Sequence, residues 1–221
     1  MNDFDESNPG GDAPCFAHEL VDGQPVDPQQ WRDVNRFRKA ERIRLLARRR
    51  EVPQARLKEM AQQVGAGLDK LISPQEGMVI AGYWPIRGEL DLRFWLKTAH
   101  EAGAELALPV VVQRNAPVEF HRWAPGAKMN RGIWNIPVPA VAEPLIPDIV
   151  LSPLLGVDAQ GYRLGNGGGY YDRTLAAADP LPRVIGVGHD FCPIKTIFPM
   201  HWDIPMHQVV LGDGSVRDHR P

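Results

Sequence analysis

The sequence predicts a three-layer α/β/α fold with a mainly parallel central sheet. Short apolar runs of strand length alternate along the chain with longer segments of helical character. This alternation is typical of a parallel sheet that is covered by helices on both faces. The length of 221 residues suits one such domain plus an extension, and it allows a sizeable core. We therefore expect residues 27–221 to form a single α/β domain.

Residues 1–26 are expected to be a disordered extension. The segment is rich in Gly, Pro and acidic residues, and it contains no Lys or Arg. Its apolar residues show too little periodicity to join a core. Phe16 and Leu20 are the two side chains that could dock on the domain.

The first helix is expected from Asp27 to about Glu51. Asp27 is a suitable N-cap, and Pro28 is a suitable first helical residue. The helix should end before Pro53, because the residue that precedes a proline is biased away from helical geometry.

Basic residues crowd this helix and the start of the next. Eleven Lys and Arg fall between Arg32 and Lys58. By default such residues form a solvated face. Arg38 and Arg42, four positions apart, project to the same side of the helix and could bind one polyanion together.

The remaining elements follow from the same patterns. Further helices are expected at about residues 55–71, 89–102 and 170–178. Strands are expected at about residues 78–84, 105–112, 118–123, 149–155, 184–187 and 209–211. Ligands of such sheets bind beyond the carboxyl ends of the strands, which is where we expect the site.

A glycine-rich stretch, Arg-Leu-Gly-Asn-Gly-Gly-Gly-Tyr-Tyr-Asp-Arg, runs from Arg163 to Arg173. Its glycines permit positive φ angles and close approach of the backbone to a ligand. Successive N–H groups of such a loop can bind an anion, and the positive end of the helix that starts at Tyr170 would add to the same field. Arg163 contributes a full charge, and Asp172 is a hard oxygen ligand suited to Mg²⁺. The stretch therefore predicts a phosphate and magnesium site.

Common phosphate-binding motifs do not describe this loop. No Lys-Ser or Lys-Thr follows the glycines, and Tyr170 stands where the last glycine of G-x-G-x-x-G would be. A flexible loop before a helix is the alternative interpretation of a bare glycine run.

Composition excludes several classes of protein. The net charge of −2 argues against a dedicated nucleic-acid binder. Two cysteines, Cys15 and Cys192, make no disulfide framework, so a reducing compartment is expected. The sequence shows neither a signal peptide nor an apolar run long enough to span a membrane. We expect a cytoplasmic protein that acts as a monomer on a small molecule.

The chain resembles the 5-formyltetrahydrofolate cyclo-ligase family, also called 5,10-methenyltetrahydrofolate synthetases. The resemblance rests on Leu154-Leu155-Gly156-Val157-Asp158, Gly161 and Arg163-Leu164-Gly165-x-Gly167-x-Gly169-Tyr170-Tyr171-Asp172, and it extends over about residues 36–211. It implies a fold of the NagB/RpiA/CoA-transferase type. It also implies ATP-dependent, Mg²⁺-dependent cyclisation of a reduced folate.

The resemblance also implies roles for particular residues. Those implied for ATP binding are Arg38, Lys39, Arg42, Arg163, Leu164, Gly165, Asn166, Gly167, Gly168, Gly169, Tyr170 and Tyr171. Those implied for folate binding are Trp84, Glu89, Asn166, Gly167, Gly168, Gly169 and Tyr170. Asp172 and Asp203 would hold the metal, and Arg163, Tyr170 and Asp172 would serve catalysis. Arg38 stands where the family usually has Lys, with Lys39 as the neighbouring candidate.

From the residues alone, some of these side chains have simpler explanations. Glu89 would be a carboxylate at a helix start, where its negative charge interacts favourably with the helix dipole. Trp84 would be a core residue at a strand end, and Tyr170 and Tyr171 would be packing aromatics. Asp203 would be a surface acid.

Two departures from the family pattern leave alternatives open. His207 replaces a frequent Asp, and Val138 replaces a common Glu. A catalytically silent paralogue would bind folate or nucleotide without ATP turnover. An RNA-binding module that uses the arginine-rich helix is a third hypothesis, although no aromatic stacking pattern accompanies the basic run.

Overall fold

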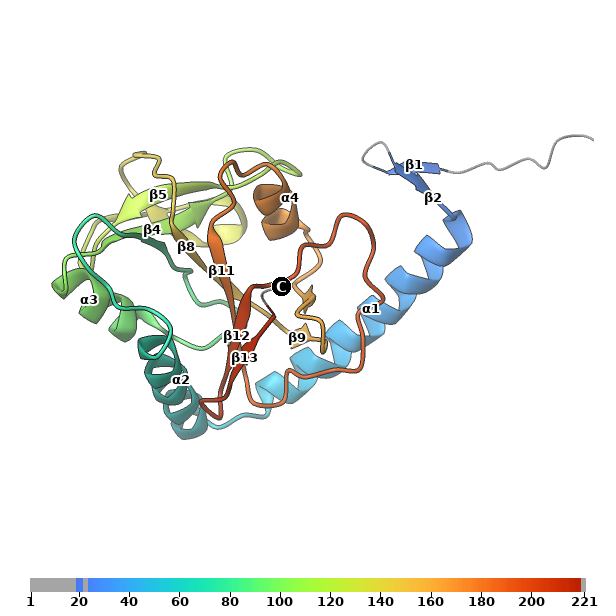
Figure 1. Cartoon of the computed structure of the whole chain (residues 1–221), viewed down its shortest axis with the longest axis horizontal. Coiled ribbons are helices and arrows are strands. Elements are labelled where there is room, and N and C mark those ends of the chain that lie inside the picture. Colours follow the sequence, from blue (N-terminus) through green and yellow to red (C-terminus); the bar gives the residue numbers. More distant parts are fainter. Residues whose placement is uncertain (1–18, 22–23, 220–221) are drawn as a thin grey trace, which may run out of the picture.

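A seven-stranded sheet forms the centre of the protein (Figure 1). The computed structural model describes residues 19–21 and 24–219. The strands, in their spatial order, are β13 (Val216–Asp218), β12 (Gln208–Leu211), β11 (Arg183–Gly188), β8 (Ile149–Pro153), β3 (Val79–Ala81), β4 (Glu105–Val110) and β5 (Glu119–Trp123). The strands from β12 to β4 run parallel, and β13 and β5 join the two edges in antiparallel orientation. The prediction of a mainly parallel sheet is confirmed.

Helices cover both faces of the sheet. α2 (Gln54–Asp69) and α3 (Arg93–Glu101) lie on one face, and α4 (Tyr170–Ala176) lies on the other (Figure 1). Because side chains alternate along a strand, neighbouring residues of β8 serve different layers. Leu151 belongs to the core with α2 and α3, whereas Val150 packs in the cluster that Tyr170 and Tyr171 of α4 join. The three-layer architecture is therefore confirmed.

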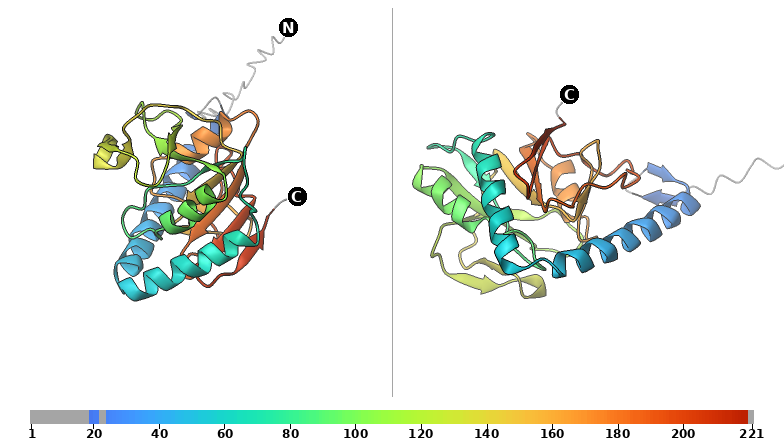
Figure 2. Two further views of the ribbon diagram at one scale, coloured as in Figure 1. Left: turned by 90° about the vertical axis from the view of Figure 1, so that its left-hand side faces the viewer. Right: turned by 90° about the horizontal axis from the view of Figure 1, so that it is seen from below.

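α1 (Pro28–Arg50) runs along one side of the domain (Figures 1 and 2). Asp27 is its N-cap, as predicted, and the Asp27 carboxylate accepts a hydrogen bond from the Gln29 N–H at 2.7 Å. The buried residues of the helix are Val34, Arg38, Leu45 and Arg49. Two arginines therefore belong to the face that packs on the domain. The expectation of a solvated basic face is wrong for these two.

The helix expected from Glu89 begins instead at Arg93. Leu90 and Leu92 are buried, and the Tyr83 hydroxyl donates to the Leu90 carbonyl at 2.7 Å, which fixes the segment before the helix. Asp91, not Glu89, accepts from the Arg93 N–H at 3.0 Å. The explanation of Glu89 as a helix-start carboxylate is therefore wrong.

Several short pairs of strands were not predicted. These are β1 (Glu19–Val21) with β2 (Gln24–Val26), β6 (Met129–Arg131) with β7 (Pro137–Pro139), and β9 (Gly156–Val157) with β10 (Arg163–Leu164). A 3₁₀ turn, Ile133–Asn135, lies between β6 and β7. β1 and β2 fall inside the extension for which disorder was expected, and they sit at the far end of α1, away from the sheet (Figures 1 and 2). Phe16 lies outside the described residues.

Across the part of the chain that the structure describes, no helix has both the length and the apolar character needed to cross a membrane.

Candidate active site

A cavity of about 1170 Å³ opens where several parallel strands end. Residues at or just after the carboxyl ends of β3, β4 and β8 line it, including Trp84, Pro109 and Pro153. This is the place that the fold class predicts for a ligand. Pockets for one drug-sized molecule are commonly about 300–1,000 Å³. The cavity is therefore large enough for two small ligands side by side.

The cavity brings almost every predicted site residue together. The lining includes Arg38, Arg42, Trp84, Glu89, Arg163, Leu164, Gly165, Asn166, Gly167, Gly168, Gly169, Tyr170, Tyr171, Asp172 and Asp203. Lys39 is the exception, because it is exposed on α1 and does not line the cavity. Of the two candidates at that end of the site, the structure places Arg38 at the cavity.

Guanidinium groups lie directly against the glycine loop. Gly167 and Gly169 have φ angles of 98° and 64°, which confirms the predicted left-handed backbone at these positions. A Cβ atom added to three of the glycines would meet an arginine. The pairs are Gly165 with Arg163 Nη1 (2.6 Å), Gly167 with Arg42 Cζ (3.4 Å) and Gly169 with Arg173 Nη1 (2.7 Å). The loop lacks side chains where positive charges approach its backbone.

Arg163 and Asp172 form an ion pair at the two ends of the loop. Arg163 Nη2 donates to Asp172 Oδ2 at 2.8 Å, and the Arg163 guanidinium lies 4.9 Å from the Tyr171 ring centroid. Both charged side chains are largely buried. Burial raises the pKa of Tyr171, and its hydroxyl has no hydrogen-bond partner among the described residues. The pair fixes the loop at β10 and at the first turn of α4.

Arg38 is held by the protein itself. Its guanidinium makes a two-armed ion pair with Asp203, with nitrogen–oxygen distances of 3.0 and 2.5 Å. It also donates to the Ile197 and Phe198 carbonyls, both at 2.9 Å. Asp203 in turn accepts from the Met200 N–H at 2.6 Å. Arg38 therefore ties α1 to the segment before β12, and few of its donors remain for a ligand.

Arg42 is a better candidate for binding an anion. Its Nε donates to the Gly165 carbonyl at 2.8 Å, and it forms no ion pair with a carboxylate among the residues that the structure describes. Burial lowers the pKa of Arg42, the positive charges of Arg38 and Arg163 lower it further, and the Asp203 carboxylate partly offsets this shift. Arginine nevertheless remains charged in proteins. A half-buried charge without a counter-ion beside the glycine loop favours a bound anion.

The lining beside the glycine loop also contains the aromatic ring of Trp84 and the carboxylate of Glu89. Glu89 Oε2 accepts from the Ile86 N–H at 3.0 Å, and Glu89 Oε1 accepts from Asn166 Nδ2 at 3.3 Å. Asn166 belongs to the glycine loop, so Glu89 lies directly beside that loop. Burial raises the pKa of Glu89. The Arg93 guanidinium lies 4.6 Å from the Trp84 ring centroid, and Trp84 is half-buried.

Trp134 and Arg173 are among the lining residues that sequence reasoning missed. Trp134, which has a φ of 57°, is exposed at the cavity, and its ring lies 5.5 Å from the Tyr170 ring. Arg173 donates to the Gly168 carbonyl and lies 5.1 Å from the Tyr170 ring centroid. Arg173 directly follows Asp172, so its charge was a usable signal. Nothing in the local pattern around Trp134 indicates that its hairpin folds over the cavity.

The chemistry of two neighbouring carboxylates fits a magnesium ion that is shared with phosphate oxygens. Asp172 Oδ1 accepts from the Ile204 N–H at 3.4 Å, so Asp172 lies next to the residue that follows Asp203. Mg²⁺ usually takes only one or two carboxylates together with substrate phosphates. The described residues contain no cluster of three or more His, Cys, Asp or Glu side chains suited to a metal. The metal role of Asp172 and Asp203 stays a prediction.

The two departures from the family pattern lie outside the cavity lining. His207 Nδ1 accepts from the Val184 N–H at 2.9 Å at the start of β11. Val138 is part of β7, where it packs close to Gly132. Neither residue changes the arrangement of side chains around the glycine loop.

These features define a class of protein. It is a three-layer α/β protein with an arginine-clamped glycine loop at the carboxyl ends of its parallel strands. Residues 34–212 match the model of the 5-formyltetrahydrofolate cyclo-ligase family. The chain belongs to that family.

Similar proteins carry the same family name. The 5-formyltetrahydrofolate cyclo-ligase of Mycolicibacterium smegmatis is 34% identical over 157 residues, which cover 67% of this chain and 80% of the relative. That of Escherichia coli is 28% identical over 170 residues, which cover 74% of this chain and 93% of the relative.

Solved structures share the fold. The NMR structure of the 5,10-methenyltetrahydrofolate synthetase of Aquifex aeolicus has a TM-score of 0.70 at 27% identity, and the match covers 84% of this chain and 94% of that one. The synthetase of Mycoplasma pneumoniae has a TM-score of 0.65 at 21% identity, with 78% and 96% coverage. At 21% identity, the similarity to the Mycoplasma pneumoniae structure shows a shared fold alone.

The environment of Glu89 leads to a pH prediction. If the Glu89 carboxylate accepts hydrogen bonds from the pterin, Glu89→Gln should raise the KM for the folate about tenfold, because a charge-assisted hydrogen bond contributes about 1.5–3 kcal/mol. In the wild type, KM should rise as the pH falls through the raised pKa of Glu89, since the carboxylate is then lost. The KM of the variant should not show this rise at acidic pH. Steady-state kinetics at a series of pH values tests both points, and an unchanged rise in the variant would exclude the assignment.

Proposed function

We propose that the protein catalyses the ATP-dependent cyclisation of 5-formyltetrahydrofolate to 5,10-methenyltetrahydrofolate, with release of ADP and phosphate. Membership of the family supports this reaction. The observation that carries the proposal is that one cavity holds both an arginine-clamped glycine loop and aromatic side chains with a partly buried carboxylate. The first suits a triphosphate, and the second suits a pterin ring with its N–H donors.

The reaction needs a better leaving group than hydroxide. The formyl oxygen on N5 attacks the γ-phosphorus of ATP, and ADP departs. N10 then attacks the activated formyl carbon, the carbon–oxygen bond breaks, and phosphate leaves with the former formyl oxygen. N10 loses its proton as the ring closes. Phosphoryl transfer of this kind depends on positioning and on neutralising charge, and it needs no covalent nucleophile.

The residues of the cavity divide this work. Arg42, Arg163 and Arg173 would lie along the phosphates, because each already contacts the glycine loop. Asp172 and Asp203 would hold Mg²⁺, which supplies further positive charge to the phosphate oxygens. Arg163 and Arg38 can then exchange part of their contacts with these carboxylates for phosphate oxygens. Trp84, Trp134 and Tyr170 would pack against the rings of the ligands, and Glu89 would orient the pterin.

Two other hypotheses gain no support from these contacts. A silent paralogue was suggested by His207 and Val138, but neither residue lines the cavity. RNA binding was suggested by the arginines of α1, but Arg38 and Arg49 are buried against the domain and bind carbonyl oxygens. The described basic surface is correspondingly smaller than the sequence indicates.

Turnover by the purified protein tests the proposal. The protein is incubated with 5-formyltetrahydrofolate and Mg-ATP, and the absorbance of methenyltetrahydrofolate is followed. Product should form only when ATP is present, with one ADP released for each ring closed. Binding of both ligands without any product would instead establish a silent paralogue.

A second prediction concerns the choice among the basic residues of α1. Arg42→Ala should raise the KM for ATP about tenfold with a smaller change in kcat, because Arg42 would bind phosphates in the ground state and the transition state alike. Lys39→Ala should leave both constants unchanged, since Lys39 is exposed and outside the cavity. Steady-state kinetics with varied ATP compares the two variants. A larger rise in the KM for ATP in Lys39→Ala than in Arg42→Ala would show that Lys39, not Arg42, binds ATP.

A further inference from the structure

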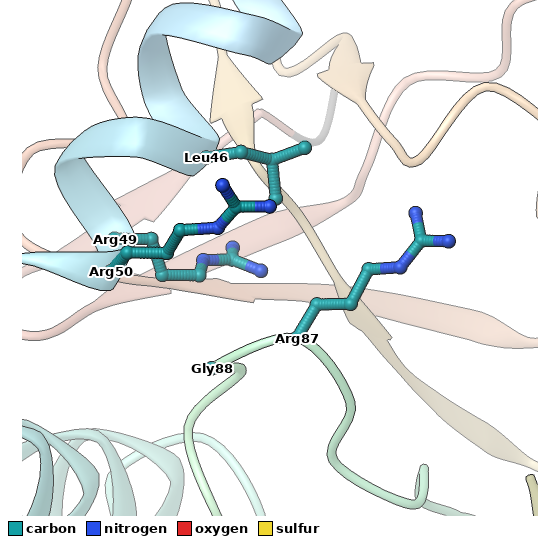
Figure 3. A pocket seen from close by; sticks show the side chains of 5 residues that line it. All are labelled: Leu46, Arg49, Arg50, Arg87 and Gly88. Atoms are coloured by element: carbon teal, nitrogen blue, oxygen red, sulfur yellow. The ribbon is translucent and has the colours of Figure 1, made fainter.

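A second cavity, of about 620 Å³, is lined by residues with a strong positive charge (Figure 3). Its lining consists of Leu46, Arg49, Arg50, Arg87 and Gly88. Leu46, Arg49 and Arg50 come from the last turns of α1, whereas Arg87 and Gly88 belong to the turn after β3. The guanidinium groups of Arg49 and Arg50 lie near one another, that of Arg87 lies apart from them, and no carboxylate is part of the lining (Figure 3).

Arg49 carries a charge that the described residues leave poorly compensated. It is only 3% exposed. Its Nη2 donates to the Leu154 carbonyl at 2.8 Å, while Nε and Nη1 have no hydrogen-bond partner in the described part of the chain. No carboxylate in the described part of the chain forms an ion pair with Arg49. The charge of Arg49 lowers the pKa of Glu89, but the Glu89 carboxylate accepts its hydrogen bonds from Ile86 and Asn166. A buried charge without a counter-ion is costly.

The positive field of Arg49 also affects its neighbours. Burial, reinforced by the charge of Arg49, lowers the pKa of His189 to about 4. His189 is therefore neutral at physiological pH and adds no second positive charge beside Arg49. Burial raises the pKa of Cys192 to about 12, so this thiol also stays neutral. Cys192, the neighbouring group that could become an anion, therefore does not balance the charge of Arg49.

The turn after β3 is shaped to complete the cluster. Arg87 has a φ of 50° and Gly88 has a φ of 74°. Left-handed backbone is costly for a residue other than glycine, and it persists where the surroundings require it. A Cβ atom on Gly88 would lie 3.2 Å from Cγ of Arg49, so glycine allows the turn to approach the stem of that arginine. The turn thereby places Arg87 opposite the end of α1.

Arg87 also lines the large cavity, so the two cavities adjoin at this residue. An anion in the smaller cavity could therefore belong to a molecule whose rings occupy the larger one. It could equally belong to a separate solute. Both sources present the same chemistry to the arginines, an oxyanion that accepts charge-assisted hydrogen bonds.

We propose that the cavity between the end of α1 and the turn after β3 binds an oxyanion, a carboxylate or a phosphate, through Arg50 and Arg87 within the field of Arg49. This site is separate from the glycine loop. The ability of this site to bind an anion does not rest on the proposed function. Only the identification of the anion's source uses the kinetics of the proposed reaction.

The test uses a double variant, Arg50→Gln with Arg87→Gln. Glutamine keeps much of the length and the polar end of each side chain but removes the charge. Both arginines are exposed, so the fold should survive, which a thermal melt verifies. Buried Arg49 is left in place. Arg44→Gln is the matched control, because Arg44 is an exposed arginine of α1 that lines neither cavity.

Calorimetric titration with inorganic phosphate is done while a non-hydrolysable ATP analogue at saturating concentration fills the glycine loop. The wild type and the control should bind phosphate with equal affinity. The double variant should bind at least about tenfold more weakly, a loss of about 1.4 kcal/mol, because it removes both charged donors. Repeating the titration at higher ionic strength should weaken the wild type as well.

Kinetics identify the source of the anion. The KM for 5-formyltetrahydrofolate is compared with that for 5-formyltetrahydropteroate, which lacks the carboxylate-bearing tail. If the tail occupies the site, the double variant should raise only the first constant. If a separate solute occupies it, phosphate affinity falls in the double variant, while Arg50→Gln alone, which changes only the smaller cavity, leaves both constants unchanged. Unchanged phosphate affinity together with an unchanged ratio of the two constants would overturn the proposal.

Discussion

Asp172→Asn should reduce turnover at least a thousandfold while the protein remains folded. The asparagine keeps an oxygen that can accept from Arg163, so the contact between β10 and α4 survives. It removes the negative charge that would hold Mg²⁺ on the phosphates, and lost charge stabilisation of a transition state typically costs about 10²–10³-fold. The loss of the metal adds to this effect. The measurements are kcat from methenyltetrahydrofolate absorbance and Tm from a thermal melt.

Asp172→Ala is the informative companion variant. It should be equally inactive but also less stable, by about 3 kcal/mol, because it leaves buried Arg163 with neither a charge nor a hydrogen-bond acceptor at this position. The pair of variants therefore separates a functional loss from a structural one. Near-wild-type turnover in Asp172→Asn would show that Asp172 does not bind the metal.

Arg163→Ala should lower kcat by about 10²–10³-fold. Arg163 is 8% exposed and contacts Gly165, Tyr171 and Asp172, so its charge acts within a nearly water-free part of the loop. Arg163→Lys keeps the charge but loses the planar fork, and it should recover only part of the rate. Arg44→Ala is the control, since it removes an exposed arginine of α1.

The ATP dependence of Arg163→Ala distinguishes two roles. If Arg163 stabilises the transition state, kcat falls much more than the KM for ATP rises. If it only positions the loop, Tm and the KM for ATP change together while the kcat of the remaining complex stays high. The second pattern would show that Arg163 is a positioning residue.

Much of the fold could be predicted because its signals are local. The N-cap at Asp27 and the alternation of apolar strands with helices depend on residues a few positions apart. The short pair β9 and β10 and the hairpin of β6 and β7 could not be predicted, since strands of two or three residues carry no periodicity. Glu89 was misplaced because an acid near an expected helix start is a good cap, whereas its partner Asn166 is 77 positions away.

The same distinction applies to the candidate site. The glycine loop was predictable because its glycines and charged neighbours are consecutive. The different roles of the arginines of α1 were not, because they depend on partners far along the chain. Arg38 binds Asp203, which is 165 positions away, and Arg49 binds Leu154, which is 105 positions away. The residues around Arg38 and Arg49 in the sequence do not indicate these contacts, so the sequence cannot distinguish a buried arginine of α1 from an exposed one.

Transfer of the formyl oxygen to phosphate tests the central claim most directly. The substrate is 5-formyltetrahydrofolate with ¹⁸O in its formyl group, and the phosphate released with Mg-ATP is examined by mass spectrometry. If the formyl oxygen attacks the γ-phosphorus in the glycine loop, each phosphate should contain one ¹⁸O atom. Phosphate without the label, formed while the ring closes and the ¹⁸O appears in water, would show that ATP hydrolysis and cyclisation are separate events and would contradict the account.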